Sequence, residues 1–193
     1  MEKTSVQKLA GVLKLLVTIT FICNLVALFL VPGCSRLRSL DELVEGALYF
    51  SNESSLAVTA RMMGYFVSAW QEVWLFGGPY AAVLTSFLLF CGVCTAVILW
   101  QGRRVLDTIL AGNPFQSANG VSLRRAAVCC FLISAAALIR VLWGLLYYRS
   151  LAPVLTYNAL FVPIFFMGGL LCLVMSALFR QAAELKAEND LTI

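Results

Sequence analysis

Residues 126–148 read AAVCCFLISAAALIRVLWGLLYY, an unbroken apolar run with a single charged residue, Arg140. A helix of about 20 such residues crosses a hydrocarbon core of roughly 30 Å, because each residue adds about 1.5 Å. Three more runs have the same character, at residues 9–31, 79–100 and 157–179. The sequence therefore predicts a protein with four membrane spans.

The composition agrees with a membrane protein, since hydrophobic residues make up 61% of the chain and charged residues only 12%. In lipid, each segment must satisfy its own backbone hydrogen bonds, which favours helices. We therefore expect an all-α fold, a four-helix membrane bundle forming one domain over residues 1–193. A loop at 32–78, a connection at 101–125 and a tail at 180–193 complete the chain.

Basic residues indicate the orientation. Nine of the 14 Lys and Arg residues lie in the N-terminal segment, the 101–125 connection and the tail, whereas four lie in the 32–78 loop and the short turn after residue 148. Short basic segments stay in the cytoplasm, so both termini are predicted there and the long loop outside. The net charge of +4 then indicates contact with anionic lipid rather than direct binding of nucleic acid.

Two features of the first half of the chain need interpretation. Residues 55–76 carry Trp and apolar residues at helical spacing, as in a helix that lies at the membrane interface. The basic start, the apolar run and Cys34 also fit a bacterial lipoprotein signal, in which Cys34 would be acylated. The alternative is that Pro32 and Gly33 simply end the first span.

The seven cysteines lie mostly within the predicted spans. Cys91 and Cys94 have the C-x-x-C spacing of dithiol oxidoreductases, but they would lie about 18 Å into the second span, where a thiolate is poorly solvated. The chain has no histidine and its spans have no carboxylate, so any metal would need soft thiolate ligands alone. We interpret most cysteines as small packing residues and expect no metal or cofactor.

Arg140 is the candidate ligand-binding residue. A guanidinium within a span costs at least about 2.5 kcal/mol, and no acidic residue of a span can neutralise it. It can extend to the outer interface beside Tyr147 and Tyr148, or hold an anionic ligand near the small Gly144. Carbonyls freed near Pro163 and the side chains of Asn24 and Asn158 can also accept hydrogen bonds from Arg140.

The connection predicts a hairpin on the inner leaflet. Residues 103–111 have the pattern of a short amphipathic helix that Gly112 ends, and Ser117 or Asn119 can cap the next helix. The tail continues an apolar stripe beyond the fourth span and ends in acidic residues. Hairpin and tail together form a candidate partner surface of Gly112, Asn113, Pro114, Phe115, Arg124, Arg125, Leu185, Glu188, Asn189, Asp190 and Leu191.

Three motifs give a resemblance to a known family: ILAGNPF at 109–115, LRR at 123–125 and ELKAENDLTI at 184–193. Together they resemble the bacterial membrane family catalogued as domain of unknown function 2975, over roughly the second half of the chain. The resemblance implies a small bacterial inner-membrane protein with no assigned activity. It also implies a genomic neighbour, a small helix-turn-helix regulator of the Cro type, and hence a cytosolic DNA-binding partner.

The sequence lacks a nucleophile with a positioned His, paired carboxylates within a span and a phosphate-binding glycine loop, so we expect no enzyme. The first hypothesis is a sensor or anchor for a small cytosolic regulator. The alternative is a small transporter or channel subunit for an anionic or lipidic ligand. A homo-oligomer packed through stripes of small residues stays open.

Overall fold

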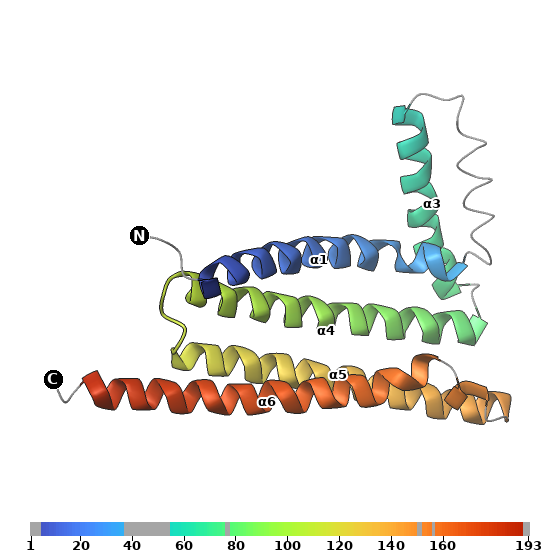
Figure 1. The fold of residues 1–193 in the computed structure, drawn as a ribbon. Helices are drawn as coiled ribbons and strands as arrows, with labels where there is room; N and C mark the ends of the chain where they lie inside the picture. The colour runs from blue at the N-terminus through green and yellow to red at the C-terminus, as the bar shows by residue number, and fades with distance from the viewer. Residues whose placement is uncertain (1–4, 37–54, 76–77, 150–151, 156, 191–193) are drawn as a thin grey trace. The chain divides into compact units, whose positions relative to one another are not determined.

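The computed structural model describes residues 5–36, 55–75, 78–149, 152–155 and 157–190 (Figure 1). This part of the chain is all-α. Its five α-helices and one short 3-10 helix are α1 (Ser5–Arg36), α3 (Ser55–Leu75), α4 (Gly78–Leu110), α5 (Ser117–Tyr148), η1 (Ala152–Leu155) and α6 (Tyr157–Asp190). Four helices, α1, α4, α5 and α6, are long and apolar enough to cross a membrane, which confirms the four predicted spans.

The chain divides into two compact units. The first unit combines Met1–Leu25 with Cys91–Ile193, and the second is Val26–Phe90. The first unit therefore holds the start of α1, most of α4, and all of α5 and α6.

In the first unit, α5 and α6 lie side by side (Figure 1). The inward face of α5 carries small or branched side chains, and Ala127, Ile133 and Ala137 are at most 1% exposed. On α6, Gly169 lies under the ring of Phe131, where a Cβ atom would come within 2.9 Å of the ring. Small residues allow this close approach, and packing is what drives helix association in lipid.

Two side-chain hydrogen bonds show that α5 and α6 are antiparallel. Ser176 donates to the carbonyl of Gly120 at 2.7 Å, and Ser134 donates to the carbonyl of Val162 at 2.8 Å. Between the two bonds the residue number rises along α5, from 120 to 134, while it falls along α6, from 176 to 162. Val162 directly precedes Pro163, which lies inside α6, so the Ser134 bond anchors α5 to α6 beside this proline.

Polar and aromatic contacts join the start of α1 to α4 within the same unit. Near the N-terminus of α1, Lys14 forms an ion pair with Asp107 at 2.6 Å. Further along, the Phe21 ring meets the Trp100 ring edge to face, with centroids 6.4 Å apart. These contacts place the N-terminal turns of α1 beside the C-terminal turns of α4.

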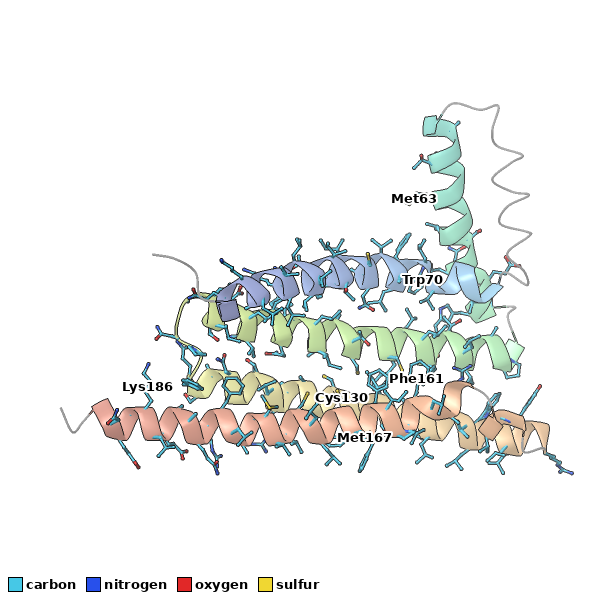
Figure 2. All side chains as sticks on the ribbon, viewed as in Figure 1. Met63, Trp70, Cys130, Phe161, Met167 and Lys186 are labelled. Atoms are coloured by element: carbon cyan, nitrogen blue, oxygen red, sulfur yellow. The ribbon has the colours of Figure 1, made fainter. Side chains whose placement is uncertain are left out.

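The second unit contains α3, the helix predicted at residues 55–76. The indole nitrogen of Trp70 donates to the carbonyl of Phe29 on α1 at 3.1 Å (Figure 2). Val73, one turn along, is 4% exposed, whereas Met63 and Trp74 are more than half exposed. The prediction of a helix here is confirmed, and it has one packed and one exposed side.

The first candidate span ends at Val31, as predicted, although helix α1 itself continues through Pro32 and Gly33 to Arg36. A proline removes one hydrogen bond of a helix whose other bonds remain. One predicted element is wrong. The amphipathic segment at 103–111 is not a separate helix, since α4 runs without a break to Leu110. The spans alone underestimate the helices, which extend into the polar flanks.

Candidate functional site

The hairpin between α4 and α5 ends α4 with a defined cap. Gly112 has a φ of +77°, its amide donates to the carbonyl of Ile109, and the Asn113 amide donates to the carbonyl of Thr108 at 3.0 Å. This pattern is a Schellman motif, in which a left-handed glycine satisfies the last helical carbonyls. The prediction that Gly112 ends the helix is confirmed.

Asn119 holds the hairpin from inside. Its side-chain amide donates to the Thr108 hydroxyl at 2.6 Å and to the Pro114 carbonyl at 2.7 Å, and the residue is 2% exposed. The expected side-chain cap of α5 is therefore wrong. Gln116 occupies the N-cap position without a side-chain hydrogen bond, and Asn119 bonds across the hairpin instead. Asn119 thereby fixes the backbone of the turn against the end of α4.

The hairpin is also fastened to α6. The ring of Phe115 lies 6.4 Å from the ring of Phe179, centroid to centroid, yet Phe115 stays 51% exposed. Ser176, one turn earlier on α6, donates to the carbonyl of Gly120 just after the hairpin. Two segments about 60 residues apart in sequence, the GNPF turn and the late part of α6, thus meet in space.

The remaining residues of the candidate partner surface lie close to this junction along their helices. Arg124 and Arg125 are exposed on α5. On α6, Leu185 is 66% exposed, about 9 Å along the helix from Phe179. Glu188 and Asn189 are exposed as well, Asp190 is the last residue of α6, and Leu191 lies outside the described residues.

Arg140 lies within a candidate span of α5 and is half-buried. Its guanidinium is within electrostatic range of the Cys91 thiol of α4. The space expected beside Gly144 is occupied, because a Cβ atom there would meet the Pro153 ring of η1 at 3.2 Å. Asn24, one of the expected partners, donates instead to the backbone of α4, to the Gly92 carbonyl at 3.0 Å.

Free thiols lie on all three helices of the first unit that follow α1: Cys91 and Cys94 on α4, Cys129 and Cys130 on α5, and Cys172 on α6. Cys94 and Cys130, the second of which is labelled in Figure 2, are buried and each 6% exposed. Cys91, one turn from Cys94, interacts with it electrostatically. Within the described ranges, no group of three or more His, Cys, Asp or Glu residues is placed to hold a metal ion.

The sequence does not predict two contacts of this site. Asn119 and Ser134 are ordinary polar residues of a helix, and nothing in the pattern indicates their bonds to other helices. A stripe of small residues at spacing four, which contains Cys130 and Ser134, was the available signal, and it predicts close approach without naming the partner.

Four long apolar helices joined by a polar hairpin define the class of the molecule: a multi-pass membrane protein of all-α fold. The chain belongs to the family described as protein of unknown function (DUF2975), whose model matches residues 11–193. This match extends the resemblance of the second half of the sequence to almost the whole chain. No curated protein and no solved structure matches the chain.

Proposed function

We propose that this protein is a non-enzymatic membrane anchor or sensor for a small cytosolic helix-turn-helix regulator. The regulator docks on the candidate partner surface, made by the hairpin residues Gly112–Phe115 and the exposed end of α6. The bacterial cytoplasmic membrane is the location that this proposal requires.

The contact between Phe115 and Phe179 is the observation that supports the proposal most directly. It brings the GNPF turn and the last turns of α6 to one place, although they are far apart in sequence. Asn119 and the Gly112 cap hold the turn in one conformation, so a partner meets a pre-formed surface and loses less entropy on binding. Leu185 offers an exposed apolar anchor beside the acidic end of the helix, which is the pattern of helix docking.

The positions of the basic residues support the cytoplasmic side of the membrane for the candidate partner surface. The contact of Lys14 with Asp107 brings the start of α1 to the hairpin, and the Phe115 contact brings the late part of α6 there. Lys14, the arginines on either side of the hairpin and Arg180 of α6 thus belong to one end of the first unit. Because short basic segments stay in the cytoplasm, we assign this end to the cytoplasmic side.

The test is co-purification in mild detergent from the native membrane, with mass spectrometry of the retained proteins. The full chain is compared with a chain that ends at Glu184 and with Phe115→Ala. Met167→Ala is the matched control for Phe115→Ala. Met167 is also a large apolar residue, 65% exposed, but it lies on α6 away from the hairpin (Figure 2). We expect a helix-turn-helix protein to be lost with the truncation and with Phe115→Ala and kept with Met167→Ala. Equal retention by all four chains, or no such protein on any of them, contradicts the proposal.

The second candidate is a small transporter or channel subunit for an anionic ligand. The position of Arg140 favours it, since a charged group in an apolar span is a functional-site hypothesis by default. Uptake of radiolabelled anions into vesicles containing the protein should then fall to background with Arg140→Leu, while circular dichroism shows an intact helical fold. Uptake that is unchanged by the substitution excludes this function for Arg140.

A further inference from the structure

Two arginines lie on each of the helices that leave the hairpin: Arg103 and Arg104 on α4, and Arg124 and Arg125 on α5. The hydrogen bond between Asn119 and Thr108 joins the two helices at this end. Counted from that bond at about 1.5 Å per residue, all four arginines lie about 6–9 Å along their helices. They therefore lie at nearly the same level of two neighbouring helices.

The ion pairs of the described residues leave these four arginines out. Asp107, the acidic residue nearest in sequence to Arg104, is paired with Lys14 at 2.6 Å. Arg180 and Glu184 form a second pair, which lies within α6. An anion from outside the chain therefore meets positive charge at this level that the described ion pairs do not neutralise.

Arg125 lies on the side of α5 that faces α4. A Cβ atom on Gly120 would meet the backbone of α6 at 3.1 Å, which identifies the side of α5 that faces α6. Successive helical residues turn by about 100°, so Ser122 points about 200° away from Gly120, and it is 5% exposed. Arg125 follows Ser122 by three residues, nearly one turn, and is itself exposed. It therefore lies at the outer edge of the contact between α5 and α4.

Arg104 lies at the same edge, on α4. It precedes Thr108 by about one turn, and the Thr108 hydroxyl accepts the hydrogen bond from Asn119 of α5. Val105 lies on the opposite side of the Thr108 direction and is 8% exposed, which identifies the side toward the interior. Arg104 is exposed, as Arg125 is. Both arginines therefore lie at the outer edge of the contact between the two helices.

Exposed apolar residues surround the two arginines. Val121 and Val128, one turn before and after Arg125, are each 51% exposed. Trp100, one turn before Arg104, is 58% exposed. Exposed apolar residues of a candidate span face lipid, and Trp is typical of the headgroup level. Arginine side chains at this depth extend to the phosphate layer of the membrane.

We propose that Arg104 and Arg125 together bind the phosphate group of one acidic membrane phospholipid. A guanidinium holds a phosphate by two parallel hydrogen bonds, and basic pockets between spans bind acidic headgroups. A lipid fits this place better than a soluble phosphate, because its acyl chains cover the exposed valines while its phosphate meets the arginines. A zwitterionic lipid fits less well, since the cation of its headgroup is repelled by the four arginines.

This site differs from the general attraction of a basic protein to acidic lipid. The net charge of +4 attracts such lipids without fixing where they bind, whereas two arginines at one helix edge define a place for one molecule. The site needs no docking partner at the hairpin. A bound lipid covers Arg125 and leaves Phe115 and the end of α6 open to a regulator.

The experiment titrates the full chain in mild detergent with dioleoylphosphatidylglycerol and counts the bound lipids by native mass spectrometry. Dioleoylphosphatidylcholine, which has the same acyl chains and a zwitterionic headgroup, is the control lipid. We expect one phosphatidylglycerol per chain to bind more tightly than any phosphatidylcholine, and equal binding of the two lipids overturns the proposal. Inorganic phosphate should not displace the bound lipid. Displacement would assign the site to soluble phosphate instead.

Variants test where the lipid binds. Arg104→Gln and Arg125→Gln should each weaken phosphatidylglycerol binding about tenfold, which corresponds to the loss of one charge-assisted hydrogen bond. Arg124→Gln is the matched control, since Arg124 is exposed at the same level but points about 100° away from Arg125. It removes the same charge and should leave the affinity unchanged.

Arg125→Lys keeps the charge and provides a second test if a glutamine variant fails to fold. Its affinity should still be lower than that of the wild-type chain, because an ammonium group cannot form the two parallel bonds. Equal losses in the Arg104, Arg124 and Arg125 glutamine variants overturn the proposal, since they indicate attraction by charge without a site. Wild-type affinity in Arg104→Gln and Arg125→Gln overturns it as well.

Discussion

Replacing Asn119 by alanine removes both hydrogen bonds that hold the hairpin to the end of α4. Each such bond contributes about 0.5–1.5 kcal/mol net, so the hairpin should lose about 1–3 kcal/mol of local stability. The Pro114 carbonyl and the Thr108 hydroxyl lose a donor at a residue that is 2% exposed. A factor of ten in an equilibrium corresponds to about 1.4 kcal/mol. The opening of the turn should therefore become about 5- to 140-fold more frequent.

Hydrogen exchange of the Asn113 amide measures this opening, because that amide is bonded to the Thr108 carbonyl within the cap. Asn119→Asp provides a second variant of nearly equal volume that accepts hydrogen bonds but cannot donate them when ionised. We expect the Asn113 amide to exchange faster than in the wild-type chain in both Asn119 variants. In Ser117→Ala, a substitution at an exposed site of the same turn, its exchange rate should stay unchanged. Exchange at the wild-type rate in both Asn119 variants would refute the argument that these two bonds hold the hairpin.

Two further substitutions test how the first unit is packed. Gly169→Ala places a Cβ atom 2.9 Å from the Phe131 ring, so the free energy of unfolding, measured by thermal unfolding in detergent, should fall by about 1–3 kcal/mol. Phe131→Leu in the same chain should restore part of this loss. A stable Gly169→Ala chain would show that α5 and α6 are farther apart. Lys14→Gln removes the ion pair with Asp107, which is partly exposed at both ends, and the same assay should show a loss below about 1 kcal/mol. A larger loss would mean that this pair is shielded from water.

The apolar runs were enough to predict the four helices that are long and apolar enough to cross a membrane, because their length and lack of charge leave few other structures in lipid. Helix ends were less predictable. Pro32 and Gly33 are residues that usually end helices, yet α1 continues past them to Arg36. The helix propensity of two residues is a weak local term, and the hydrogen bonds of the neighbouring residues outweigh it. The same reason explains why α4 absorbs the polar segment that begins at residue 103.

Features of the site that depend on neighbouring residues were predictable from the sequence, whereas contacts between distant segments were not. Gly112 was predictable as a helix end because its left-handed backbone needs only the residues around it. The Phe115 contact with Phe179 and the Ser134 bond to the Val162 carbonyl depend on the offset between helices, which no local pattern contains. A single sequence predicts which faces are small or polar, whereas their partners require the packed structure.

Helix α5 organises the first unit because its side chains bond or pack against both α4 and α6. Its first turns hold Asn119, which bonds Thr108 of α4, and its later part holds Phe131, which packs on Gly169, and Ser134, which bonds the backbone of α6. In lipid there is no hydrophobic force between spans, so close packing and these polar contacts must supply the association. The hairpin surface therefore depends on how α5 packs, since Asn119 joins α5 to α4 while Ser134 joins it to α6. A change that moves α5 against α4 or α6 alters this surface, whereas a change at an outward residue of α6 such as Met167 does not.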